Sequence, residues 1–392
     1  MARHLSILFF VLYSVVAVQL PFWPVWLAAQ GLDAAWVGLV ASIAFWTKPF
    51  ADVTAGVVVD RTGSRRRAML VLAAVALAGA GCFLVSRELA VLVVASVLWT
   101  GAFGALGPLA DNVALLTARA RGLDYGRMRV WGSVGFVATT LAGGRLLEGR
   151  DADIILYALM AGLAAAWVAC LPLADAPPTD TASANPPAAR RISPRPLLRH
   201  PVFLLFLATA IVLQPSHAVL YGFGTLHWRD LGLSGDVIGL LWVEGVLGEI
   251  VLFAFGRRLV ERVGAPRLLL LAAVAGLVRW TVLAWADNLP AIVAVQALHG
   301  LTFGASHLGA MRFLAEAVPI THSATAQTLY SGLALGIGFG VLLALSGPLY
   351  EMAGGHAYLA MTALCAVAVV GAVLLARRWR PGETLVLADE RG

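Results

Sequence analysis

Apolar residues occupy most of the chain in long runs, and short polar or basic stretches separate the runs. A helix of about 20 apolar residues is long enough to cross the hydrocarbon core of a bilayer. Twelve such runs can be identified, at 5–28, 35–59, 68–86, 90–117, 127–147, 153–173, 201–226, 235–256, 267–286, 290–315, 324–346 and 357–376. The pattern therefore predicts an all-α membrane protein with twelve transmembrane helices.

The twelve runs fall into two sets of six. Between them lies ADAPPTDTASANPPAARRISPRPLLR (174–199), whose Pro, Ala and Ser content is typical of a flexible linker. At a constant offset of 201 residues, GLDAAWVGLV (31–40) aligns with GLSGDVIGLL, and DRTGSRR (60–66) aligns with ERVGAPR. Such a parallel repeat predicts two pseudo-symmetric bundles with a substrate site between them at mid-membrane. The predicted parts are a six-helix bundle at 1–173, a cytoplasmic linker at 174–200, a second bundle at 201–377 and a cytoplasmic tail at 378–392.

The charges support this topology. Only 13% of the residues are charged, and the formal net charge is +6. Nineteen arginines fall at the ends and loops on one side of the predicted helices, whereas the other side has only Arg87, Arg145, Arg150 and Arg229. The positive-inside rule then places both termini in the cytoplasm. We expect the protein in a bacterial-type inner membrane. The basic balance thus reports topology, and we expect no nucleic-acid partner.

The chain has none of the sequence signs of an enzyme or a metal protein. Its three cysteines lie in three different apolar runs, which predicts neither a disulfide framework nor a metal site. A phosphate-binding GxxxxGK[ST] loop, a nucleophile elbow and an HExxH motif are all missing from the sequence. The first apolar run contains Pro21 and Pro24 and no cleavage site, so it is not expected to be a signal peptide. We expect a non-enzymatic monomer in the lipid bilayer that uses no cofactor other than a proton gradient.

GVVVDRTGSRRR (56–67) resembles the cytoplasmic G-xxx-D-R-x-G-x-R-R signature of the major facilitator superfamily. ERVGAPR (261–267) is similar to the weaker second copy of that signature. The resemblance covers the whole chain and implies a transporter that works by alternating access. It also implies a conformational latch that does not touch substrate, made by Gly56, Asp60, Arg61, Gly63 and Arg65.

A narrower resemblance, to the branch that holds phenylpropionate permeases and lactose/proton symporters, lies in LGPLADNVALL…LDYGRMRVWGSVGF (106–136). It implies that Asp111 and Arg129 form a polar substrate clamp, and that Phe136 contacts the substrate. Two alternatives stay open here: a structural salt bridge for the charged pair, and ordinary packing for the aromatic side chain.

LVRWTVLAW (277–285) and QALHGLTF (296–303) carry the same resemblance into the second half. They place Arg279 and His299 at the spacing of the arginine and histidine that couple transport to protons. Gln296 replaces a lysine of that motif, and Thr302 replaces the carboxylate that carries the proton.

The proton carrier must therefore come from elsewhere. Glu244 and Glu249 lie in the same half, within an apolar run. Burial of a carboxylate opposes its ionisation and a neighbouring arginine favours it, and a proton carrier needs that competition. We predict proton coupling through these two glutamates with Arg279 and His299; the alternative is a charge network that only stabilises the fold.

Lys48 is the single lysine among 28 basic residues, and it lies inside an apolar run. Asp52 is four residues further on, so the two share a helix face. The offset of 201 aligns Lys48 with Glu249. Ionisable groups at such depth are costly and usually face a protein interior or a wet path. We predict that Lys48 binds an anionic substrate; the alternative is an internal ion pair.

These residues favour secondary transport of a small organic substrate with protons, and an aromatic or other monocarboxylate is the first choice. A sugar or oligosaccharide symporter is the main alternative, because of Asp111 and Arg129. A proton-driven efflux pump and a non-transporting membrane sensor also remain open.

Overall fold

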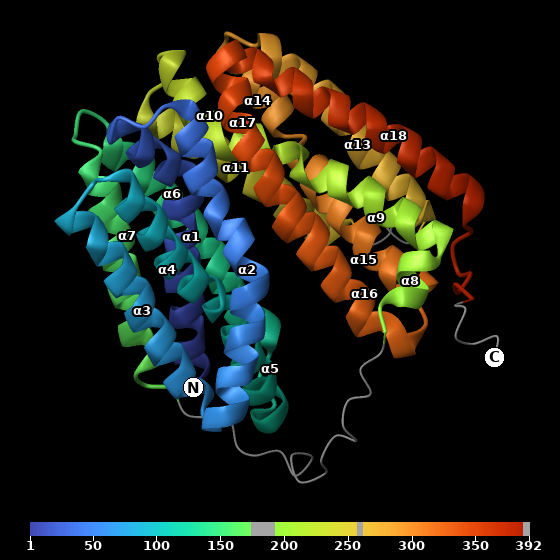
Figure 1. Cartoon of the computed structure of the whole chain (residues 1–392), viewed down its shortest axis with the longest axis horizontal. Coiled ribbons are helices and arrows are strands. Elements are labelled where there is room, and N and C mark those ends of the chain that lie inside the picture. Colours follow the sequence, from blue (N-terminus) through green and yellow to red (C-terminus); the bar gives the residue numbers. More distant parts are fainter. Residues whose placement is uncertain (174–192, 257–261, 387–392) are drawn as a thin grey trace. The chain divides into compact units, whose positions relative to one another are not determined.

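The computed structural model describes residues 1–173, 193–256 and 262–386, with the backbone alone at 52, 54, 55, 57, 58 and 60–62. The described residues form helices without a strand (Figure 1). In the first half of the chain these are α1 (Ala2–Ala29), α2 (Ala34–Thr62), α3 (Arg65–Val85), α4 (Leu89–Gly104), α5 (Leu106–Arg121), α6 (Tyr125–Leu147) and α7 (Asp153–Cys170). In the second half they are α8 (Arg195–Arg199), α9 (Pro201–Leu213), η2 (Gln214–His217), α10 (Ala218–Asp230), α11 (Gly235–Phe255), α13 (Ala265–Trp285), α14 (Leu289–Gln296), η3 (Gly300–Ala305), α15 (Ser306–Ala317), η4 (Ile320–His322), α16 (Ser323–Tyr330), η5 (Ser331–Gly338), α17 (Phe339–Ala353), η6 (Gly354–Ala357) and α18 (Tyr358–Arg378).

The predicted spans are confirmed. Each of the twelve predicted ranges falls on one helix or on a series of consecutive helical segments. Ten segments of the described chain are long and apolar enough to cross a membrane, and one of these, Ile320–Arg378, has 59 residues. At about 1.5 Å per residue that segment is far too long for one crossing, and the turn at Gly354 divides it into two. With the 23-residue helix α6, the described chain fits the predicted twelve-helix architecture.

Four spans are interrupted near their middle, one by a break and three by a change of helix type, which the apolar pattern does not predict. The span of α4 and α5 breaks at Ala105, and the span of α9 and α10 tightens into the 3₁₀ turn η2, which contains Pro215. The last two interruptions are the π-helical segments η3 and η5. Such π segments occur often at functional sites, because they displace side chains from the regular helix faces.

Contacts divide the chain into two compact units. The first unit comprises Met1–Ser183 with Tyr221–Val243, and the second comprises Ala184–Leu220 with Glu244–Gly392. The predicted domain boundaries remain a prediction. Most of the predicted linker lies outside the described residues, and its described end forms the short helix α8.

In the first unit, α1 packs against α6 and α7, and α3 packs against α4 and α7. In membrane proteins, small residues at helix interfaces allow the helix backbones to approach each other closely. A Cβ atom at Gly135 of α6 would lie 2.2 Å from the carbonyl oxygen of Phe10 in α1, so only glycine fits that position.

In the second unit, α13 packs against α15, α18 and η3. Arg279 and Trp280 of α13 are both fully buried. The segment after α18 folds back onto this unit. The Trp379 ring packs 4.9 Å from the Phe313 ring, and the Leu385 backbone N–H donates to the Ala317 carbonyl at 2.7 Å.

Candidate functional site

The first unit contains a polar cluster around Arg129 of α6. The Arg129 Nε and Asp111 Oδ1 atoms lie 3.8 Å apart, which joins α6 to α5. The Tyr125 hydroxyl donates to Asp111 Oδ1 at 2.9 Å, and Arg129 Nη2 donates to the Tyr13 hydroxyl of α1. The side chains of Arg129 and Asp111 remain 30% and 40% exposed. The ion pair at the centre of the cluster is therefore long, and both of its side chains are partly accessible to solvent.

Aromatic rings surround the same guanidinium. The Arg129 Cζ atom lies 4.1 Å from the centre of the Tyr13 ring and 5.6 Å from that of Phe9. Ring faces stabilise a cation and hold it in place. The sequence paired Asp111 with Arg129 but indicated neither tyrosine. No spacing along the chain relates Tyr13 of α1 to α6, whereas Tyr125 lies four residues before Arg129 on α6, a spacing that could have placed it beside the pair.

The two other predicted substrate residues, Phe136 and Lys48, take no part in the contacts described above. Phe136 is buried in α6. Lys48 is half-buried in α2, a helix that contributes none of the Arg129 contacts described above. Their predicted contact with substrate stays a prediction.

The second unit contains a more deeply buried polar chain centred on Arg279, whose exposed fraction is 0%. Arg279 Nη1 lies 2.8 Å from His299 Nδ1 and donates to the Thr302 hydroxyl at 2.8 Å. Arg279 Nη2 donates to Gln296 Oε1 at 2.6 Å. The two positions that depart from the symporter motif, Gln296 and Thr302, thus provide acceptors for the buried guanidinium.

This arrangement fixes the proton positions on His299. A guanidinium has donors and no acceptor, so His299 Nδ1 must accept from Arg279. The ring proton of neutral His299 therefore lies on Nε2, which is 2.8 Å from Glu249 Oε1. The result is a directed chain in which Arg279 donates to His299 and His299 donates to Glu249.

The chain continues on the other side of Thr302. His217 Nδ1 lies 3.0 Å from the Gln214 carbonyl oxygen, and a carbonyl only accepts, so Nδ1 carries the ring proton. His217 Nε2 then accepts from the Thr302 hydroxyl at 3.1 Å. No spacing along the chain relates His217 to Thr302, so the sequence did not indicate this contact.

Backbone geometry brings Glu249 to His299. A Cβ atom at Gly300 would lie 2.4 Å from the Gly248 carbonyl oxygen, so α11 and η3 touch at two glycines. His299 immediately precedes the π-helical segment η3, and Thr302 lies within it. Glu244 lies five residues before Glu249 on α11 and is partly exposed.

The structure describes three of the five residues of the predicted latch in full, namely Gly56, Gly63 and Arg65. Gly63 ends α2 with a φ of 64°, which favours glycine, and the Ser64 side chain caps α3. Arg65 Nε donates to Asn112 Oδ1 at 2.7 Å, and Gly56 is exposed. The side chains of Asp60 and Arg61 lie outside the described residues, so the latch as a whole stays a prediction.

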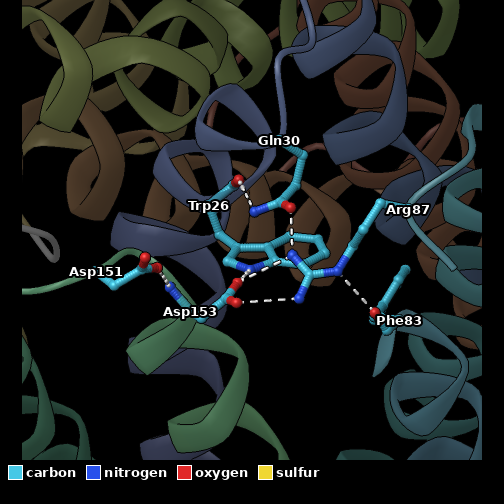
Figure 2. Close-up of polar contacts among 6 residues, drawn as sticks. All are labelled: Trp26, Gln30, Phe83, Arg87, Asp151 and Asp153. Atoms are coloured by element: carbon cyan, nitrogen blue, oxygen red, sulfur yellow. Dashed lines mark hydrogen bonds and ion pairs between the residues drawn. The ribbon is translucent and has the colours of Figure 1, made fainter. Parts of the chain in front are cut away.

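A third polar cluster is centred on Arg87, which follows α3 (Figure 2). Arg87 donates to both carboxylate oxygens of Asp153, at 3.0 and 3.1 Å, and to Gln30 Oε1. The Trp26 indole N–H donates to Asp153 at 2.9 Å, and the Arg87 guanidinium lies 5.2 Å from the Trp26 ring centre. The hydrogen bond to Asp153 raises the pKa of Arg87. Because the partners lie in or directly after α1, α3 and α7, we interpret this cluster as a structural link within the unit; the sequence indicated only that Arg87 lies in a loop.

The all-helical fold with twelve apolar spans, and the charged residues inside those spans, are typical of a membrane transporter. A family model of the MFS_1 like family matches residues 2–360, so the chain belongs to that family of major facilitator transporters. The resemblance inferred from GVVVDRTGSRRR is confirmed.

Two curated relatives cover nearly the whole chain. A probable 3-phenylpropionic acid transporter of Escherichia coli (strain K12) is 31% identical over 365 residues, which are 93% of this chain and 95% of that protein. A maltose permease of Geobacillus stearothermophilus is 29% identical, over 95% of this chain and 94% of that protein.

Among solved structures, a crystal structure of the nucleoside transporter NupG matches with a TM-score of 0.81. That alignment covers 97% of this chain and 99% of NupG, at 17% identity. At this identity the match supports the fold alone. This chain is thus a multi-pass membrane protein of a transporter family.

Proposed function

We propose that this protein carries a small organic anion, of which an aromatic monocarboxylate is the first choice, across the membrane together with a proton. The observation that carries the proposal is the chain from Arg279 through His299 to Glu249. Transport proceeds by alternating access and draws on the proton gradient alone. The protein acts as a monomer in a bacterial inner membrane with both termini in the cytoplasm.

Glu249 is the proton carrier in this proposal. His299 cannot take a second proton without losing the hydrogen bond that Arg279 donates to Nδ1. Glu249 can take a proton while the Arg279–His299 bond stays intact, since its carboxyl oxygen still accepts from His299 Nε2. Its side chain is 21% exposed, so protons can reach it. Glu244, on the same helix and nearer to solvent, delivers or receives the proton.

Arg129 is the substrate anchor, with Lys48 as the second cation and Phe136 as the aromatic contact. A substrate carboxylate can replace Asp111 beside Arg129, because that ion pair is long, at 3.8 Å, and accessible. An arginine fork holds a carboxylate through two parallel hydrogen bonds. The 31% identity to a probable 3-phenylpropionic acid transporter supports this substrate class.

A sugar is the second candidate. Asp111 and Arg129 together offer an acceptor and donors for two hydroxyl groups, and a maltose permease is 29% identical. A sugar would be held with the Asp111–Arg129 pair intact. A carboxylate would displace Asp111, which makes the two candidates separable.

The test uses purified protein in proteoliposomes with a pH-sensitive dye inside. Aromatic carboxylates, neutral sugars and cationic drugs are added in turn, with the wild type and with Lys48→Ala, Asp111→Asn and Arg129→Lys. We expect aromatic carboxylates to acidify the lumen, and both cation variants to raise the substrate KM.

Asp111→Asn separates the two substrate classes. For a carboxylate it should leave KM unchanged or lower it, because a competing anion is removed. For a sugar it should raise KM, because an acceptor becomes weaker. Arg127→Gln is the matched control, since that side chain is 89% exposed two residues before Arg129. Acidification by sugars alone would replace the carboxylate by a sugar, and the absence of any substrate-driven proton movement would refute proton coupling.

A further inference from the structure

The second unit contains a basic cavity that is separate from the proposed substrate and proton residues and includes part of ERVGAPR (261–267). It measures about 320 Å³ and is lined by Arg262, Arg267, Arg312 and Arg380, with Trp379 and Gly264 among its other walls. The described lining residues include no acidic side chain. Four guanidinium groups around one cavity create a strong attraction for an anion.

Nearby carboxylates offset this charge only in part. Glu316 Oε1 accepts from Arg312 Nε at 2.5 Å, one turn along α15. Glu383 Oε2 accepts from the Arg380 backbone N–H at 3.3 Å, and its carbonyl accepts from the Trp379 indole at 2.7 Å. Both contacts brace the walls, and the side chains of Arg262, Arg267 and Arg380 remain exposed.

The start of α13 adds to the attraction. Gly264 precedes this 21-residue helix with a φ of 80°, and no side chain caps the first turn. The uncapped backbone N–H groups and the helix dipole favour an anion at this end. The side-chain charges and the backbone thus favour a ligand of the same sign.

We propose that this cavity binds a phosphate-bearing anion, either the headgroup of an anionic phospholipid or a soluble phosphate ester. Arginine forks match the geometry of phosphate oxygens. The cavity lies at the start of α13 and the end of α18, two membrane-spanning helices, and therefore near the level of lipid headgroups.

Binding there would also fix the segment after α18. Trp379 is buried against Phe313, and Arg380 and Pro381 of the same segment line the cavity. A bound phosphate would therefore link this segment to the start of α13 and stabilise the second unit. The proposal is independent of the transported substrate.

The experiment measures binding to the full-length protein in nanodiscs, together with its unfolding temperature. One arm compares phosphatidylglycerol with phosphatidylcholine. The other adds glycerol 3-phosphate or inorganic phosphate to phosphatidylcholine nanodiscs. The double variant Arg262→Gln/Arg380→Gln removes two charges from the cavity, and Arg119→Gln/Arg121→Gln removes two exposed charges from the end of α5 as the matched control.

We expect phosphatidylglycerol or a soluble phosphate to bind the wild type and the control with equal affinity. The cavity variant should bind at least about tenfold more weakly, because each lost hydrogen bond between a guanidinium and the phosphate lowers the binding free energy. The first arm alone responding identifies a lipid headgroup, and the second arm responding identifies a soluble phosphate. Arg262→Lys/Arg380→Lys should bind with intermediate affinity, because it keeps the charge and loses the fork. Equal losses in cavity and control variants, or no binding in either arm, would overturn the proposal. If the double glutamine variant does not fold, Arg267→Gln alone gives the same test.

Discussion

The two units each hold an arginine within a spanning helix, and the two arginines are placed very differently. Arg129 is 30% exposed and faces a carboxylate at 3.8 Å. Arg279 is fully buried and donates short hydrogen bonds to a histidine, a threonine and a glutamine. Both lie against aromatic rings, at 4.1 Å from Tyr13 and 4.5 Å from Trp280.

This difference in burial and hydrogen bonding indicates different roles for the two arginines, one in substrate binding and one in proton coupling. Arg129 can exchange its long ion pair for a ligand at little cost, because the pair is partly solvated. Arg279 cannot leave its acceptors without stranding several buried polar groups, which is far more costly. We therefore expect Arg129 to meet substrate and Arg279 to hold His299 in the orientation that faces Glu249.

Replacing the proposed proton carrier should have the largest effect. Glu249→Gln keeps an acceptor for His299 and removes the titrating group, so proton-coupled uptake should fall by about 100-fold or more. Wild-type uptake should decline as the external pH rises, because protons become scarce, whereas exchange by the variant should not depend on pH. Glu351→Gln, at an exposed position of α17, is the control. A variant that still couples normally would assign the proton to another group.

The contrast between the arginines can be tested by the same substitution in both. Arg279→Lys loses the planar fork that serves His299, Thr302 and Gln296, and should destabilise the protein by about 3 kcal/mol or more. Arg129→Lys keeps a cation beside Asp111 and should alter the substrate KM with little change in stability. Unfolding midpoints and uptake kinetics measure both. Equal stability losses would remove the distinction between the two sites.

Thr302 offers a sharper test of the buried chain. Thr302→Val keeps the shape but removes the hydroxyl between Arg279 and His217, and should lower stability by about 1–3 kcal/mol. Thr302→Ser should restore most of that loss. If valine and serine behave alike, the hydroxyl has no part in the chain.

The smallest expected effect is at Tyr13. Tyr13→Phe removes the hydroxyl that accepts from Arg129 but keeps the ring beneath the guanidinium, so KM should change by less than about tenfold, equivalent to 1.4 kcal/mol. Tyr125→Phe, which removes the hydroxyl that donates to Asp111, gives the matched measurement on the other side of the ion pair. A loss as large as that for Glu249→Gln would mean that the tyrosine hydroxyl takes part in proton coupling.

Much of the fold could be predicted because the signal is local. The length of each apolar run sets a membrane crossing, and turn residues such as Gly63 and Ser64 mark where α2 ends and α3 begins. The helix-type changes at Gln214–His217, Gly300–Ala305 and Ser331–Gly338 were not predicted. Apolar and small residues fill the last two segments as they do the regular helices, and Gln214–His217 is a four-residue polar segment inside a long apolar run.

The candidate site likewise has features that the sequence predicted and features that only the tertiary structure shows. The sequence by itself determined the spans, the positions of Arg129, Arg279, His299 and Glu249 within them, and, through family resemblance, the pairing of Asp111 with Arg129. Only the tertiary structure decided that Tyr13 contacts Arg129, that Thr302 joins Arg279 to His217, and that Arg87 binds Asp153. Spacing along one helix fixes which side chains share a face, whereas contact between helices depends on how closely their backbones approach, as Gly248 and Gly300 do beside Glu249 and His299.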